Sequence, residues 1–160
     1  MATAPVRIVA SYILQRERTL DISQLLTTTS APRVLVDAYR SVSSVDEALH
    51  RPGVDPHVIG TGLADRMSIA ASNATMAAMR VLADAVEGSA NIARPTYVRS
   101  VAQSVAMSAM EMARAAGVAY AHSEYPLTAA QTEKRVPLTE CARDTKFLLE
   151  EAIEGYAPAN

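Results

Sequence analysis

Two alanine-rich stretches in the middle of the chain place apolar residues at alternating intervals of four and three. The first seam is Met67, Ala71, Ala74, Ala78, Val81 and Ala85, and the second is Val98, Ala102, Val105, Ala109, Met112, Ala116 and Ala119. This alternation is the heptad rhythm of helices that lie side by side. Because many seam positions are alanine, the two backbones can approach near the low end of the usual interaxial range of roughly 8 to 10 Å. Residues 88–94 form a short connection, which predicts an antiparallel hairpin.

The two predicted long helices, from about Thr61 to Glu87 and from about Pro95 to Ala121, are apolar beyond these seams. The additional apolar residues are Ile69, Met76, Met79, Ala83 and Val86 on the first helix and Ala106, Met110, Ala113 and Gly117 on the second. A helix that is apolar on most sides either is central to a bundle or lies against another subunit, and the sequence leaves both open. The methionines at helical spacing are Met67, Met76, Met79, Met107, Met110 and Met112. Filling gaps in a core is the preferred interpretation of them, and an adaptable binding groove is the alternative.

Apolar periodicity predicts shorter helices on either side of the pair. We expect a first helix over about 5–16, a short second helix after Thr19, a third helix after Ser30 and a last helix after Thr139. Ser44 and Glu47 have the spacing of a capping box, which predicts a separate short helix over about 45–50. No segment shows the strict alternation of a strand. The expected fold is an all-α bundle of five to seven helices, centred on the long antiparallel pair, in a single domain spanning residues 1–160.

Composition excludes several classes of protein. A chain of 160 residues that is 49% hydrophobic and 20% charged is not wholly disordered, and its formal net charge of −2 gives no global positive field for nucleic acid or anionic membrane. The single Cys141 rules out an internal disulfide framework. No segment has the length and apolarity of a membrane span, and the amino terminus lacks a signal-peptide pattern, so a cytoplasmic protein without membrane contact is expected.

The sequence shows no constellation of residues typical of catalysis. Glu47 and His50 form one half of a di-metal carboxylate motif that bundles use twice, so we expect no metal, and no cofactor pattern is present. A buried structural role is preferred for Cys141 over a nucleophile. The acidic residues Glu150, Glu151 and Glu154 are interpreted as a solvated last turn.

Five arginines in the first forty residues are candidates for contacts with a nucleic-acid backbone. They are Arg7, Arg16, Arg18, Arg33 and Arg40. Phosphate contacts require reach and charge and read no bases. The alternative is that Glu17, Asp21 and Asp37 pair with these arginines on a solvated helix face.

The segment 7–42, RIVASYILQRERTLDISQLLTTTSAPRVLVDAYRSV, resembles the opening of the small-subunit family of archaeal type I-A CRISPR effector complexes. The shared features are an apolar first helix, Leu-Asp-Ile-Ser at 20–23 leading into a second helix, and a helix that ends in Tyr-Arg-x-Val at 39–42. The resemblance implies a non-enzymatic helical subunit that stacks along the complex and helps to hold guide RNA, target strand or displaced strand.

The leading functional prediction is therefore a non-catalytic structural subunit of a nucleoprotein assembly, with other protein subunits or copies of itself as partners and RNA or DNA backbone as a further one. An alternative is a self-assembling helical coat or shell protein. A second alternative is a helical-bundle enzyme with a site built around His122, Glu124 and the loop that follows.

Overall fold

The computed structural model describes residues 21–54, 60–124 and 138–159. These residues form five helices: α2 (Ile22–Thr28), α3 (Arg33–Leu49), α4 (Thr61–Glu87), α5 (Pro95–Glu124) and α7 (Leu138–Glu154). Within the described ranges the only β structure is two isolated bridges. The all-α bundle is confirmed, whereas the predicted first helix over 5–16 lies outside the described residues.

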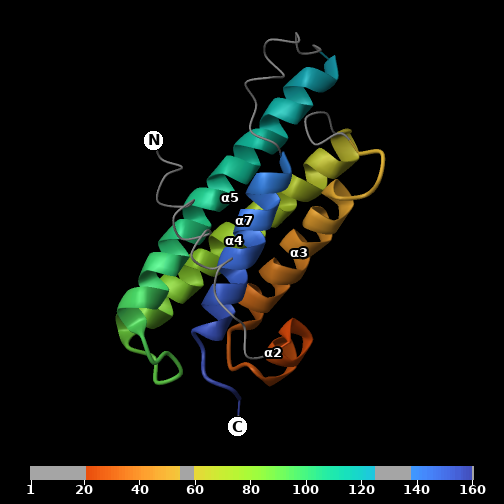
Figure 1. Cartoon of the computed structure of the whole chain (residues 1–160). Coiled ribbons are helices and arrows are strands. Elements are labelled where there is room, and N and C mark those ends of the chain that lie inside the picture. The colour runs from red at the N-terminus through yellow and green to blue at the C-terminus, as the bar shows by residue number, and fades with distance from the viewer. Residues whose placement is uncertain (1–20, 55–59, 125–137, 160) are drawn as a thin grey trace.

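The four longest helices form a ring in which each helix packs against two others. Helix α4 lies between α3 and α5, and α7 closes the ring by packing against the same two helices (Figure 1). Helices α4 and α7 are therefore diagonal to each other. The short α2 packs against α7 near one end of the bundle.

The predicted antiparallel pair is the main packing unit of the bundle. Helices α4 and α5 make the most extensive contact, and every residue of the two predicted seams is buried. Helix α4 ends where predicted, at Gly88, whose φ of +74° lies in the left-handed region that glycine adopts without strain. The Ser89 N–H then donates to the Asp84 carbonyl over 3.0 Å, which satisfies one of the last carbonyls of the helix.

The predicted break before residue 45 is wrong. Helix α3 runs without interruption from Arg33 to Leu49, so Ser44 and Glu47 lie inside it and cap nothing. No glycine or proline occurs between 33 and 49, and the buried Val42 and Val45 continue the same apolar face. A capping-box spacing alone does not stop a helix whose core face continues through it.

The carboxyl-terminal tail joins two turns at one end of the bundle. The Ala157 N–H donates to the Asn91 carbonyl over 2.7 Å, and the Ser30 N–H donates to the Ala157 carbonyl over 2.9 Å. The buried Tyr156 hydroxyl donates to Asp84 Oδ2 over 2.7 Å. Burial, and then the hydrogen bond and charge of Asp84, raise the pKa of the Tyr156 phenol. The tail thus fixes the turn between α4 and α5 against the turn between α2 and α3.

Candidate functional site

Two of the five candidate arginines lie in the described residues, on the outer face of α3. The Arg33 and Arg40 side chains are 92% and 62% exposed, and Asp37 lies between them. Arg33 Nε is 3.5 Å from one Asp37 carboxylate oxygen, and Arg40 Nη1 is 4.0 Å from the other. The structure brings these two arginines together around an aspartate. Arg7, Arg16 and Arg18 lie outside the described residues.

Glu47 and His50 do not form a metal site within the described residues. Both residues are exposed, and His50 Nδ1 lies 2.8 Å from the Asp46 carbonyl oxygen instead. The Asp46 carboxylate also lies 3.6 Å from Lys146 Nζ on α7. In the described part of the chain, no three His, Cys, Asp or Glu side chains gather as ligands for a metal ion.

Cys141 is buried in the first turns of α7, as preferred from the sequence. Burial, and then the negative charges of Glu111, Asp144 and Glu140, raise the pKa of its thiol to about 12. The thiol therefore stays protonated near neutral pH and behaves as a small apolar side chain.

The interpretation of Glu150 and Glu151 as solvated surface is wrong, since they are 5% and 1% exposed. The Tyr39 hydroxyl on α3 donates to Glu150 Oε1 over 3.0 Å, and the Tyr97 hydroxyl on α5 donates to Glu151 Oε1. The bonded residues are 111 and 54 positions apart in the chain, so the sequence carries no local signal of either pair. These carboxylates join α7 to both of its neighbours.

A buried hydroxyl pair links α5 to α7. Ser108 Oγ and Thr145 Oγ1 lie 2.6 Å apart, and the Thr145 hydroxyl donates to the Cys141 carbonyl over 2.7 Å. Because that bond uses the Thr145 hydrogen, Ser108 is the donor of the pair. Both residues are almost fully buried, so this contact is part of the core.

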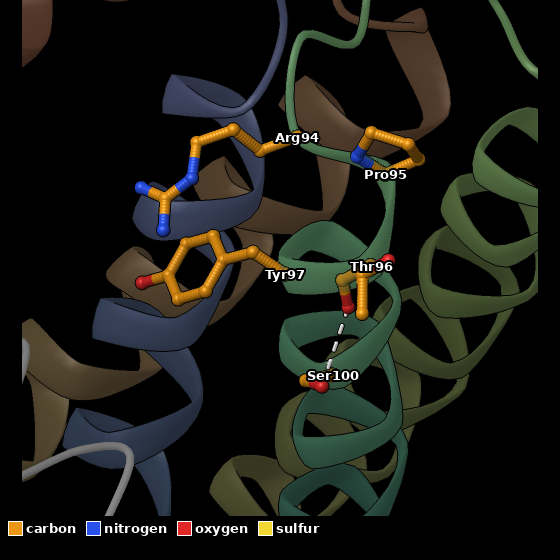
Figure 2. A pocket seen from close by; sticks show the side chains of 5 residues that line it. All are labelled: Arg94, Pro95, Thr96, Tyr97 and Ser100. Atoms are coloured by element: carbon orange, nitrogen blue, oxygen red, sulfur yellow. Dashed lines mark hydrogen bonds between the residues drawn. The ribbon is translucent and has the colours of Figure 1, made fainter.

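An open hollow of about 370 Å³ lies at the start of α5 (Figure 2). Its lining is Arg94, Pro95, Thr96, Tyr97 and Ser100. The Arg94 guanidinium stacks 4.5 Å from the centre of the Tyr97 ring, and the Tyr97 hydroxyl is bonded to Glu151. The Ser100 hydroxyl donates to the Thr96 carbonyl over 3.3 Å, the bond drawn in Figure 2. None of these lining groups forms a nucleophile–base pair.

Most of the large apolar side chains that are exposed in the described residues lie in a stripe along α4, on the side opposite its buried seam. We define the outer stripe as Ile69, Ser72, Met76, Met79, Ala83 and Val86. Its four large apolar side chains are exposed by 59%, 56%, 66% and 66% in chain order, and its two small residues, Ser72 and Ala83, are exposed as well. Its intervals of three and four residues keep the stripe on one face of the helix.

The outer stripe corrects the preferred interpretation of the methionines. Met67 and Met112 are fully buried, whereas Met76, Met79 and Met110 are 56%, 66% and 62% exposed. The spacing of apolar residues predicted this second apolar side of α4 and left open whether other helices of the bundle cover it. The described bundle does not cover it. Contiguous exposed apolar surface of this kind marks interaction sites in folded proteins.

No protein-family model, curated protein or solved structure matches this chain. Among the described helices, none has the length and apolarity needed to span a membrane.

Proposed function

We propose that this chain is a non-catalytic structural subunit that assembles with other protein subunits through the outer stripe of α4. The observation that carries the proposal is the apolar character of α4 on two opposite sides. The bundle buries one side in the seam with α5 and leaves Ile69, Met76, Met79 and Val86 in contact with water. Covering these side chains with a protein surface removes apolar area from water, which drives association.

The use of the buried polar groups supports the structural part of this proposal. Glu150 and Glu151 accept hydrogen bonds from tyrosines of neighbouring helices, and Ser108 with Thr145 closes the contact between α5 and α7. The Cys141 thiol, whose pKa is about 12, is protonated near neutral pH. These groups hold the helices in place and leave the outer surface for partners.

A finer form of the proposal is a nucleoprotein assembly of the CRISPR effector type, working in the cytoplasm. It is supported by the resemblance over 7–42 and by the exposure of Arg33 and Arg40. Asp37 lowers the positive charge of their face, so backbone contacts of useful strength require Arg7, Arg16 and Arg18 as well. The coat or shell alternative uses the same outer stripe and differs in requiring large homopolymers. The enzyme alternative is built around His122 and Glu124, at the end of α5, and the loop that follows them, and that loop lies outside the described residues.

The proposal is tested by the size of the complex that contains the chain in extracts of its own cells. A tagged wild-type chain is expected to elute well above its own mass of 17.0 kDa. A variant with Met76→Glu and Met79→Glu is expected to elute at its own mass, because buried carboxylates oppose any apolar contact. The matched control adds the same charge at exposed positions of α5, Gln103→Glu with Ala121→Glu, and should elute like the wild type. Equal elution of all three chains at 17.0 kDa would refute the proposal.

A further inference from the structure

We propose that the outer stripe of α4 binds the same stripe of a second copy of this chain, with the two α4 helices antiparallel about a two-fold axis. This inference rests on the proposed function and names the partner. Its basis is that the stripe is a palindrome in both size and spacing. In either direction it runs large, small, large, large, small, large, at intervals of three, four, three, four and three residues. A two-fold contact requires such a surface, because the same patch must complement itself.

Antiparallel alignment about the midpoint of the stripe pairs residues of like size. Ile69 faces Val86 of the partner subunit, Ser72 faces Ala83 of the partner subunit, and Met76 faces Met79 of the partner subunit. The two layers of small residues let the backbones approach closely, while the central methionines adapt their shape to each other. The buried seam between α4 and α5 already has an antiparallel geometry spaced by small residues.

The one polar side chain of the stripe is compatible with a covered surface. A serine inside a helix can donate its hydroxyl hydrogen to the backbone carbonyl four residues earlier. Ser72 on α4 can therefore lie in a contact between helices without leaving an unpaired donor. The described part of the core already contains such a bond, from the Thr145 hydroxyl to the Cys141 carbonyl.

The charges beside the stripe fit the same alignment. One flank of the stripe carries Arg66 and Glu87 near its two ends and Arg80 between them, and all three side chains are exposed. Arg80 Nε lies 3.1 Å from Asp84 Oδ1 of its own helix, so Arg66 and Glu87 are the charges of this flank that remain for a partner. A two-fold axis across antiparallel helices brings like flanks together, so Arg66 lies near Glu87 of the partner subunit and the pair is repeated at the other end. Within the described residues Glu87 makes no ion pair, and Arg66 donates to Ser44 Oγ over 2.6 Å, which holds it on this flank. A parallel alignment would instead bring this flank against the partner's opposite flank and leave both charges without a counter-charge.

The opposite flank of the described α4 carries no charge that would oppose the contact. Ser68, Thr75 and Leu82 lie on that side, and Thr75 and Leu82 are half-buried. Asp65 lies beyond the end of the stripe. In this register it also lies past the end of the partner's α4, so it does not face that helix. Complementarity in size, in spacing and in charge therefore all select one partner and one register. Binding to a different protein would not require a palindromic stripe or matching charges at its two ends. A second copy of this chain does require them, so it is the partner that we infer.

Engineered cysteines test the register directly in the full-length chain. Ser72→Cys and Ala83→Cys are introduced singly and together, and each variant is oxidised under mild conditions. Positions 72 and 83 lie roughly 16 Å apart along one helix, so no bridge forms within a chain. The native Cys141 does not compete, because it is buried and its pKa is about 12.

The antiparallel register predicts covalent dimers from the double variant and from an equimolar mixture of the two single variants. Neither single variant alone should cross-link, since each new thiol then faces a native side chain without sulfur. Cross-linking of the single variants to the same extent as the double variant would overturn the register. Failure of every sample to cross-link, with wild-type protein monomeric at high concentration, would overturn the dimer itself.

Charge reversal gives an independent readout. Glu87→Arg alone should weaken self-association about tenfold or more at low salt, and adding Arg66→Glu to it should restore the wild-type affinity. Loss of affinity in both variants would contradict the predicted pair. The proposed function is distinguishable from this inference. If pure protein does not dimerise but the stripe substitutions still release the chain from a larger particle in cell extract, only the identity of the partner is wrong.

Discussion

At the scale of single residues, the polar side chains buried along α7 have partners on other helices. Thr145 accepts from Ser108 on α5, and Glu150 accepts from Tyr39 on α3. Buried hydroxyls and carboxylates are costly when they lack partners, so these contacts favour one arrangement of α7 over its alternatives. They also explain why an acidic segment lies in the core of a bundle whose other contacts are mostly apolar.

The hydroxyl pair gives a first prediction. Thr145→Val removes the oxygen that accepts the Ser108 hydrogen bond and keeps the volume of the side chain. The buried Ser108 hydroxyl then lacks this acceptor, so the free energy of unfolding should fall by about 1–3 kcal/mol. Thr75→Val is the matched control. The Thr75 hydroxyl also donates to the carbonyl four residues earlier, over 2.9 Å, but it is only half-buried and has no partner on another helix among the described residues. The control should change stability by no more than about 0.5 kcal/mol in urea unfolding. Equal losses in the two variants would contradict a structural role for the pair.

The Cys141 thiol gives a prediction about alkaline pH. Its pKa is about 12 in the folded chain against an ordinary value of 9.0. As pH rises, the thiol therefore loses its proton in the unfolded chain before it does so in the folded chain. The contribution of the thiol to the free energy of unfolding is complete below about pH 9 and is lost as pH rises toward 12. One proton corresponds to a slope of about 1.4 kcal/mol per pH unit in that window. In Cys141→Ala the free energy of unfolding should therefore fall less steeply between about pH 9 and about pH 10.5. The difference in slope from the wild type should approach about 1.4 kcal/mol per pH unit. An unchanged slope would show that the thiol does not contribute.

At the scale of helices, the two sides of α4 have different surroundings. The seam side packs against α5 through Ala74 and its neighbours, and the outer stripe contacts water. Both sides have intervals of three and four residues, so the same pattern produces a core in one place and an exposed surface in the other. The difference arises from the ring of four helices, which places α3 and α5 beside α4 and nothing described on the outer side.

Sequence periodicity therefore predicted the elements better than their surroundings. The bounds of α4, the end at Gly88 and all seam residues follow from spacing and from one glycine, which are local signals. The continuity of α3 was missed because the local spacing of Ser44 and Glu47 indicates a helix start. The buried face that continues through this point becomes evident only from the packing of α3 against its neighbours. The exposure of Met76 and Met79 was also missed, because a single sequence does not show which of two apolar sides the bundle covers.

The close alanine seam gives a prediction at this scale. Ala74→Leu together with Ala109→Leu inserts two large side chains where both residues are fully buried, and should destabilise the fold by about 1–3 kcal/mol or more through overpacking. Ala113→Leu, at an exposed position of α5, is the control and should stay within about 0.5 kcal/mol. Urea unfolding followed by circular dichroism measures both. A double variant as stable as the parent would show that the two helices do not approach closely.

At the scale of the whole molecule, the candidate arginines and the outer stripe lie on different helices. The candidate arginines of the described residues lie on α3, and the outer stripe lies on α4. The proposed contact with a second copy and the proposed contact with a nucleic-acid backbone therefore use different surfaces.

The nucleic-acid contact is tested by filter binding with single-stranded and duplex probes at low salt. Arg33→Ala with Arg40→Ala should lower affinity equally for all base sequences and reduce the log–log salt slope, since each lost phosphate contact contributes roughly 0.7 to 0.9. Stability should change little, because exposed ion pairs contribute at most about 1 kcal/mol. Arg99→Ala with Arg114→Ala removes two exposed arginines from α5 and is expected to bind like the wild type. Binding of the α3 variant that equals the wild type would assign Arg33 and Arg40 to surface ion pairs with Asp37.

Self-association through the outer stripe is the central claim, and sedimentation equilibrium of the pure protein tests it most directly. The wild-type chain is predicted to sediment at twice its mass of 17.0 kDa as concentration rises, and the variant with Met76→Glu and Met79→Glu at 17.0 kDa with an unchanged helical signal. The control with Gln103→Glu and Ala121→Glu should match the wild type. A wild-type chain that remains a monomer at all concentrations, or a stripe variant that dimerises as strongly as the wild type, would contradict self-assembly through α4.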